Sequence, residues 1–454
     1  IIFTTADTST GWLGLRFFSA DNSSELSFCV VERGKTLGGP QRPFDNGGGI
    51  YCESCNLSVT SCLIKYNNAW EGHGGGIFCS NSNIVISDNE IISNFSGWGG
   101  AGIWCEYSDV TITCNLIMDN VTYYPLGGEW GGGITCKVSE VVISDNVICN
   151  NSSYHIGGGI LVSRCTALIE FNSIIDNYVL EFGGGILAHL SALTLSNNLI
   201  INNSAPYGGG GGGLMMDLGS DLYINNNTIY GNNGLLNGGG LQVRLEEADT
   251  LINNIIWGNT SEYGEDNIYF EGDSTNIIYC NVGGGWPGEG NIDVDPLFRD
   301  PDNGDFHLMA TYCGDPYDSP CIDAGHPDIL DSLLDCDWGL GELRSDMGAY
   351  GGGLVHVGID NQVIEVPSRF ILAQNYPNPF NAYTTIRYNL PKETDVTIDI
   401  YDILGRKVTM LQNGLQQAGY HQVIWDADDK STGIYFYKIQ TGDFVETKKM
   451  LLVK

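Results

Sequence analysis

Basic side chains are scarce in this sequence. Its 454 residues include 20 lysines and arginines but 54 aspartates and glutamates, so the formal net charge is −34 at pH 7. Such an acidic chain repels nucleic acid and anionic membrane surfaces, which excludes both as main partners. Long apolar runs are missing as well, since no stretch of eighteen or more apolar residues occurs. This absence excludes a membrane-spanning helix.

Apolar residues at helical spacing are also absent, which excludes a helical solenoid. Short runs such as 84–86 (IVI) and 110–112 (VTI) are typical of β-strands instead. Glycine-rich runs that end in an aliphatic anchor recur at steps of 26 residues (Ile134 to Ile160) to 31 residues (Ile103 to Ile134). The anchors are Ile50, Ile77, Ile103, Ile134, Ile160, Ile186, Leu214 and Leu241. This repeat predicts an all-β chain whose main part is a parallel β-helix with one coil per repeat.

Asparagines recur in phase with these anchors. Twelve residues after successive anchors lie Asn89, Asn115, Asn146, Asn172 and Asn198. Equal positions of stacked coils lie above one another, about 4.8 Å apart. We therefore expect these five asparagines to form a structural ladder in which each side-chain amide bonds to the next.

Cysteines follow the same phase in four coils. Cys52, Cys79, Cys105 and Cys136 each lie two residues after an anchor, and we expect them to pack in the core as thiols. The fourteen cysteines permit disulfides outside the cytoplasm. Further along the chain, we expect Cys313 to pair with Cys321 or with Cys336.

Three segments of different composition divide the chain. Residues 1–292 carry the repeats, and residues 293–358 form an aspartate- and proline-rich segment that we expect to cover the last coil, followed by a linker. Residues 359–454 alternate as in antiparallel strands and predict an Ig-like β-sandwich. In the middle segment, Asp300, Asp302 and Asp305 are candidate calcium ligands. The alternative is a solvated acidic surface.

The last segment contains several motifs that resemble a known family. They are 374–381 (QNYPNPFN), 400–406 (IYDILGR) and 433–437 (GIYFY). Together they resemble the C-terminal sorting domain of the bacterial type IX secretion system, although the loop 425–433 is shorter than in that family. The resemblance implies handling by the type IX machinery, export across the outer membrane, and then release or attachment to the outer cell surface.

The middle segment has a resemblance of its own. Its motifs 295–298 (DPLF), 319–325 (SPCIDAG) and 346–350 (DMGAY) resemble the close of secreted right-handed parallel β-helix proteins of the pectate-lyase-like superfamily. The resemblance implies a right-handed parallel β-helix solenoid. That superfamily holds lyases, hydrolases, adhesins and structural proteins, so the fold alone does not decide the function.

Aromatic residues precede the glycine corner in six successive coils. They are Trp70, Trp98, Tyr124, Trp130, Tyr154, Phe182 and Tyr207. An aromatic stripe along one edge suits the stacking of sugar rings or contact with another subunit. The alternative is that the rings shield the backbone of the glycine corner.

Catalytic residues cannot be assigned from the repeats. Asp88 and Asp145 share an offset, eleven residues after their anchors, but their coils are not adjacent. We therefore favour an extracellular or cell-surface structural or adhesive protein. Because the first residues already have strand character, an open end is expected that joins copies head to tail into a filament. The alternatives are a polysaccharide-degrading lyase or hydrolase and a non-catalytic glycan-binding protein.

Overall fold

The structure is a computed structural model, and it divides into two compact units, Ile1–Gly353 and Leu354–Lys454. It describes residues 1–6, 11–19, 24–36, 45–123, 131–217, 222–244, 250–263, 266–271, 276–331, 334, 336, 338–352, 370–372, 375, 380, 383–416, 419–427, 430–442 and 444–453.

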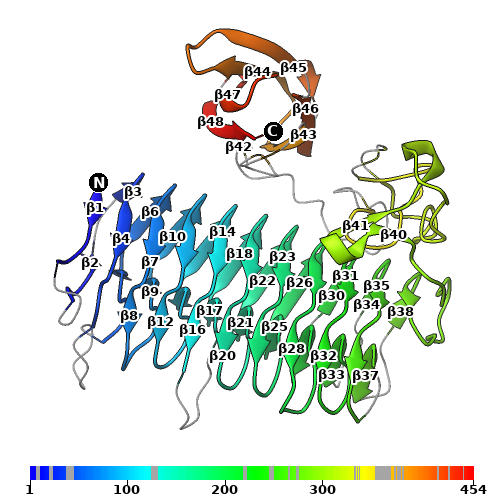
Figure 1. The fold of residues 1–454 in the computed structure, drawn as a ribbon, viewed down its shortest axis with the longest axis horizontal. Helices are drawn as coiled ribbons and strands as arrows, with labels where there is room; N and C mark the ends of the chain where they lie inside the picture. Colours follow the sequence, from blue (N-terminus) through cyan, green and yellow to red (C-terminus); the bar gives the residue numbers. More distant parts are fainter. Residues whose placement is uncertain are drawn as a thin grey trace. The chain divides into compact units, whose positions relative to one another are not determined.

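The first unit contains a parallel β-helix of about nine turns, in which the inner coils contribute one strand to each of four parallel sheets, and the coils at the two ends have no strand in the fourth (Figure 1). Sheet I, which follows the glycine corner, consists of β2 (Leu15–Phe18), β5 (Ile50–Glu53), β9 (Ile77–Ser80), β13 (Ile103–Glu106), β17 (Ile134–Lys137), β21 (Ile160–Ser163), β25 (Ile186–His189), β29 (Leu214–Asp217), β33 (Leu241–Arg244) and β37 (Ile268–Glu271). Sheet II consists of β3 (Ser24–Ser27), β6 (Asn56–Thr60), β10 (Asn83–Ser87), β14 (Asp109–Thr113), β18 (Glu140–Ser144), β22 (Thr166–Glu170), β26 (Ala192–Ser196), β30 (Leu222–Asn225), β34 (Thr250–Ile252) and β38 (Asn276–Ile278).

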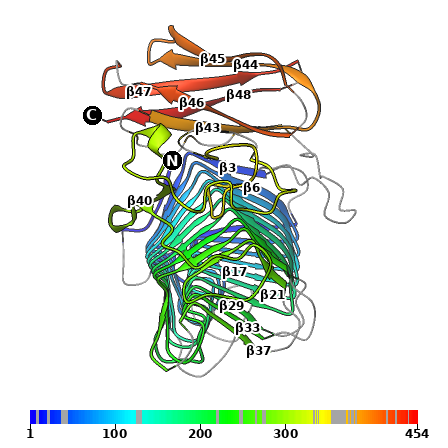
Figure 2. The same ribbon diagram turned by 90° about the vertical axis from the view of Figure 1, so that its right-hand side faces the viewer.

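The other two sheets complete each coil. Sheet III consists of β1 (Ile2–Phe3), β4 (Val30–Glu32), β7 (Leu63–Lys65), β11 (Glu90–Ile92), β15 (Leu116–Met118), β19 (Val147–Cys149), β23 (Ser173–Ile175), β27 (Leu199–Ile201), β31 (Thr228–Tyr230), β35 (Ile255–Trp257) and β39 (Asn281–Val282). Sheet IV consists of β8 (Asn68–Ala69), β12 (Phe95–Ser96), β16 (Val121–Thr122), β20 (Ser152–Ser153), β24 (Tyr178–Val179), β28 (Ser204–Ala205), β32 (Asn233–Gly234) and β36 (Thr260–Ser261). The coils superpose when seen along the stack (Figure 2).

Equal positions of successive coils pair in register. Ile77 pairs with Ile103, and Ile103 pairs with Ile134, so the anchors form one buried column. Because side chains alternate across a strand, every second residue of sheets I, II and III enters a common core. The parallel β-helix predicted from the repeat is therefore confirmed.

The asparagines at the turn between sheets II and III form a continuous ladder. The side-chain amide of Asn89 donates to Asn115 Oδ1 at 2.9 Å, and the amide of Asn115 donates to Asn146 Oδ1 at 2.9 Å. The contacts continue to Asn172 and Asn198 at 3.0 Å each. Each ladder side chain also bonds to backbone groups, so the turns of neighbouring coils are tied together.

The glycine corners leave no space for side chains. A Cβ added to Gly159 would lie 2.6 Å from the carbonyl oxygen of Gly185 in the next coil. We expect Gly159→Ala to lower the free energy of unfolding by about 3 kcal/mol, because backbone atoms cannot move aside singly. Chemical denaturation measures this. Gly304→Ala is the control: its Cβ meets nothing within 4 Å, so only the cost of its positive φ of 85° remains, ~1 kcal/mol. Equal losses in both variants would contradict the steric argument.

The segment after the last coil packs on the side of the solenoid as well as beyond its end. It contains β40 (Phe298–Asp300), η1 (Pro301–Asn303), β41 (Asp305–Leu308) and η2 (Thr311–Cys313), and Figure 1 shows it over the later coils. Phe298 and Phe306 pack against Ile255 of sheet III. Trp338 lies 5.7 Å from Phe171, several coils before the end. The expected cover of the last coil thus also packs on the side of the later coils. We call the described residues within 298–352 the lateral cap.

Disulfides join two pairs of cysteines. Cys313 bonds to Cys336, which is one of the two predicted pairs. Cys52 bonds to Cys55, so the expectation of a free thiol at Cys52 was wrong. The expectation missed that a tight turn also places Cys55 beside it. Cys79, Cys105 and Cys136 are buried thiols, and burial raises the pKa of Cys105 well above its usual value.

The second unit has two antiparallel sheets. One contains β42 (Ile371–Leu372), β43 (Tyr383–Leu390) and β46 (Gly419–Asp426), and the other contains β45 (Lys407–Gln416), β44 (Thr394–Asp402), β47 (Gly433–Gln440) and β48 (Val445–Leu452). Both sheets contribute to one core, for example through Trp425 and Tyr437. The predicted antiparallel character is confirmed. Within the described residues of the chain, no helix is long and apolar enough to span a membrane.

Candidate functional site

A row of aromatic side chains lies on the outer face of sheet I. Tyr51, Phe78 and Trp104 each follow an anchor directly, so they point away from the core. They are nevertheless only 2–4% exposed. The rings of Tyr51 and Phe78 stack with centroids 5.1 Å apart, and His73, from the loop before β9, stacks on Trp104 at 3.8 Å. The glycine-corner loops thus cover this row.

Two carboxylates lie beside the row and are held by it. The Tyr51 hydroxyl donates to Glu53 Oε2 at 2.9 Å. The indole Nε1 of Trp104 donates to Glu106 Oε2 at 3.2 Å, and the Ser80 hydroxyl donates to Glu106 Oε1 at 3.3 Å. These donors fix both carboxylates in position before any ligand arrives.

A hollow of about 410 Å³ opens between these groups. Its lining residues are Asn46, Tyr51, Glu53, Phe78, Ser80, Asn81, Glu106 and Tyr107. Glu53, Ser80 and Glu106 are in-register neighbours on successive strands, so the backbones of the two glutamates lie two steps apart, about 9.6 Å. The hollow therefore combines two oriented acids, amide groups and the exposed ring of Tyr107.

Cations close the aromatic row at both ends. The Arg16 guanidinium lies 5.3 Å from the ring centre of Tyr51, and the Lys137 ammonium lies 5.7 Å from that of Trp104. Burial lowers the pKa of Arg16 to about 10, which leaves it charged at neutral pH. Burial raises the pKa of Tyr51, and its hydrogen bond to Glu53 raises this pKa further. Tyr51 therefore stays protonated and donates.

The hollow was not predicted from the sequence, whose aromatic pattern pointed to the rings before the corner instead. In the structure, Trp70 is 58% exposed and stacks on Phe95 at 5.4 Å. Trp98 lies edge-on to His73 at 5.7 Å. The sequence signal for the hollow was an aromatic residue directly after each of three consecutive anchors.

The remaining members of the predicted stripe have various surroundings. Tyr154 packs edge-on against Tyr123 at 5.4 Å, and the Arg244 guanidinium lies 5.9 Å from the ring of Phe182. Tyr207 is 72% exposed. Tyr124 and Trp130 lie outside the described residues. A continuous aromatic stripe stays a prediction.

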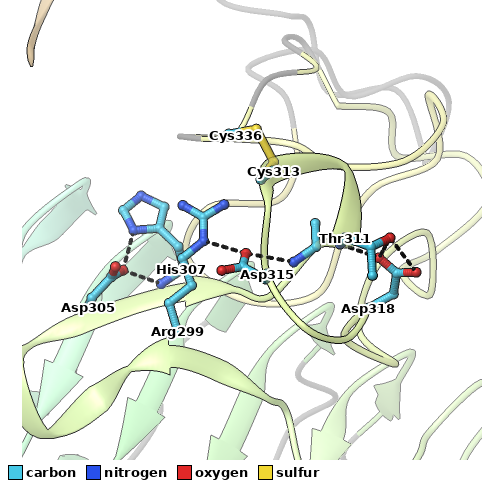
Figure 3. Close-up of polar contacts among 9 residues, drawn as sticks. Arg299, Asp305, His307, Thr311, Cys313, Asp315, Asp318 and Cys336 are labelled. Carbon is cyan, nitrogen blue, oxygen red and sulfur yellow. Dashed lines mark hydrogen bonds and ion pairs between the residues drawn. A yellow bond between two sulfur atoms is a disulfide. The ribbon is translucent and has the colours of Figure 1, made fainter.

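The acids of the lateral cap bind protein groups (Figure 3). Asp300 Oδ2 accepts a hydrogen bond from Asn303 at 2.8 Å. Asp305 lies 2.6 Å from His307 Nδ1. Burial of Asp305 raises its pKa, but the bonds and charge of His307 outweigh this and hold the pKa below its usual value.

The predicted calcium ligands do not form a ready metal site. Asp300, Asp302 and Asp305 are all described, yet no group of three or more acidic, histidine or cysteine side chains in the described part of the chain is arranged to hold an ion. Calcium binding by these three residues stays a prediction.

Comparisons with known proteins found two matches. Residues 374–454 match the family model of a secretion system C-terminal sorting domain. Residues 14–174 and 48–229 match the family model of a right-handed β-helix region. No curated protein and no solved structure matched the chain. The two family matches correspond to the parallel and antiparallel parts of the fold.

Proposed function

Since the chain is a right-handed parallel β-helix repeat protein that carries a type IX secretion sorting domain at its C-terminal end, we propose that it is a non-catalytic adhesin that binds glycans. The sorting domain indicates export to the cell surface or the extracellular space. The β-helix then acts as a stiff scaffold that presents the hollow on sheet I.

The fixed carboxylates of the hollow carry this proposal. Glu53 and Glu106 each accept a hydrogen bond from an aromatic side chain of the row, so they are already oriented to accept hydrogen bonds from sugar hydroxyls. Preorganised acceptors beside an apolar floor are typical of small-ligand sites. Because the hollow is acidic, it favours neutral or amino-sugar glycans and disfavours uronates.

Glycan binding by the full chain tests the proposal. We expect binding to neutral or amino-sugar oligosaccharides on a glycan array, with an affinity about tenfold lower for Glu106→Gln because a charged acceptor is lost. Glu140→Gln, an exposed acid at the start of β18, is the control and should bind normally. Equal binding by the natural chain, Glu106→Gln and Glu140→Gln would exclude the hollow as the binding site.

A glycoside hydrolase is the second candidate, and the spacing of the two acids favours it. The backbones of the two glutamates lie about 9.6 Å apart, close to the roughly 6.5–9.5 Å that separates the two carboxyl groups of inverting enzymes. Reducing-end release from the same oligosaccharides distinguishes the two candidates. If the natural chain releases reducing ends and Glu106→Gln binds the oligosaccharides without releasing them, the protein is an enzyme and not an adhesin.

Assembly into head-to-tail filaments stays a prediction. Negative-stain electron microscopy of the purified chain at high concentration, with and without calcium, tests it. Dispersed single particles under both conditions would refute it.

A further inference from the structure

The lateral cap uses the outer face of sheet III as its docking surface. Ile201 and Ile255 on this face are buried together with Phe298 and Phe306 of the cap. Tyr230 also packs there, 5.2 Å from Phe306. The later coils therefore show what this face does when it has a partner: it takes up apolar side chains from a chain segment that lies across several coils.

A row of asparagines beside this face completes the contact. Asn197 donates from Nδ2 to the carbonyl oxygens of Ala349 at 3.1 Å and Gly351 at 2.8 Å. Asn226 donates to the carbonyl oxygen of Asp346 at 2.9 Å. Both asparagines occupy the corner directly before a ladder residue, with positive φ. At these two corners, the solenoid thus supplies donors and the cap supplies acceptors. Asn253, at the same position of the next coil, donates to Ser345 Oγ at 3.1 Å and also accepts from the His326 N–H at 2.6 Å.

The same face continues into the earlier coils, where none of the described cap residues clusters with it. Five of its outward residues there are apolar and partly exposed, and they belong to β7, β11, β15 and β19: Leu63, Ile92, Leu116, Met118 and Val147. We call these five residues the uncovered strip. The same face also carries Glu90, Cys149 and Lys65, whose ammonium lies 3.7 Å from Glu32.

The corner beside the uncovered strip has the opposite chemistry. Asp88 and Asp145 occupy the position that Asn197 occupies in the later coils, and they share its positive φ. On the other side, Asp119 follows β15 directly, and Glu90 on the strip's own strand is exposed. In these two coils, acids thus replace the donors used by the cap, whereas Ser61 and Cys114 occupy this position in the other two coils. The negative charge favours a covering segment that brings cations.

We propose that the uncovered strip binds a short, extended segment of another protein that combines apolar and basic side chains. From β7 to β19 there are three strand steps, about 14 Å, which about four to five extended residues span. A second copy fits poorly, because both copies carry a charge of −34 and would bring acidic corners together.

Binding of a synthetic peptide to the full chain tests this inference. The probe is an eight-residue fluorescent peptide of alternating lysine and leucine, measured by anisotropy, and the comparison peptide replaces leucine by serine. We expect Leu116→Lys to weaken binding of the lysine–leucine peptide about tenfold, because it removes apolar contact and adds a like charge. Met118→Lys should act in the same way and serves as a second variant if the first does not fold.

Thr111→Lys is the matched control, because it adds the same charge to the same coil on the outer face of sheet II. It should bind the lysine–leucine peptide nearly as well as the natural chain. Equal loss in Thr111→Lys and Leu116→Lys, equal affinity for the serine peptide, or no binding at all would overturn the proposal. A dimer in light scattering that Leu116→Lys dissociates would assign the strip to a second copy instead.

Discussion

Replacing Asn146 by alanine is expected to lower the free energy of unfolding of the β-helix by about 4 kcal/mol. Asn146 is buried, and its Nδ2 donates to Asn172 Oδ1 at 3.0 Å and to the carbonyl oxygen of Ile112 at 2.9 Å. Its Oδ1 accepts from the backbone and side-chain nitrogens of Asn115 at 2.9 Å. Alanine leaves the Asn115 backbone N–H without its acceptor in a buried turn. It also removes one bond each from Asn172 Oδ1, which keeps the Asn146 N–H at 3.0 Å, and from the Asn115 amide, which keeps the carbonyl oxygen of Ile86 at 2.8 Å.

Equilibrium unfolding in guanidinium chloride, followed by circular dichroism, measures this loss. Asn83→Ala is the control, because Asn83 is an exposed residue at the start of β10, and its replacement should change stability by less than about 0.5 kcal/mol. A loss below 1 kcal/mol for Asn146→Ala would show that the ladder contributes little. Such a result would leave the core alone to hold the coils in register.

Raising the pH from 5 to 9 is expected to destabilise the lateral cap by on the order of 5 kcal/mol, because each pH unit between the unfolded and folded pKa values of a carboxyl costs about 1.4 kcal/mol. Asp331 and Asp346 are both buried in the cap. Burial raises the pKa of Asp331 to about 8, with the charge of Asp346 adding to it. Burial also raises the pKa of Asp346 to about 7.

The direction follows from where the protons are bound. In the folded cap, these two carboxyls keep their protons to about pH 7–8, whereas in the unfolded chain they lose them near pH 4. Their contribution to stability is therefore fully present below about pH 4. It declines as the pH rises and is lost once the pH passes the folded pKa values.

Limited proteolysis between pH 5 and pH 9, calibrated with a protein substrate of pH-independent stability, measures opening of the cap. Asp331→Asn should flatten the pH dependence of cleavage, because an amide does not ionise in this range. Its oxygen can still accept from the Gly352 N–H, which donates to Asp331 at 2.6 Å. Asp318→Asn is the control, since that carboxyl is at the surface and its pKa is lowered by the bonds from Thr311. Equal cleavage at both pH values in the natural chain would refute the prediction.

The coil was predictable from the sequence because stacking forces equal residues to equal phase. Ile77, Ile103 and Ile134 share one column, and any larger or polar residue there would disrupt two neighbours at once. Asn115 and Asn146 recur for the same reason, since each satisfies the turn of the adjacent coil. The period of the sequence therefore reflects the contacts between neighbouring coils.

Features without a repeat were harder to predict. The hollow depends on Tyr51 and Trp104 being covered by loops, and nothing in a single coil records that cover. The position of the lateral cap depends on contacts such as that between Asn197 and Gly351, which are 154 residues apart. The disulfide of Cys52 depends on a turn that brings Cys55 within bonding distance. The regular spacing of the repeat does not specify this turn.

The orientation of the interstrand hydrogen bonds determines how the β-helix responds to force. These bonds run along the stack, so tension applied along it opens the outermost coil first and leaves the others intact. Each opened coil, such as that from Ile134 to Ile160 with 26 residues, releases roughly 90 Å of extended chain. A surface protein pulled in this way lengthens stepwise and dissipates the load, whereas force across the stack meets many rungs at once.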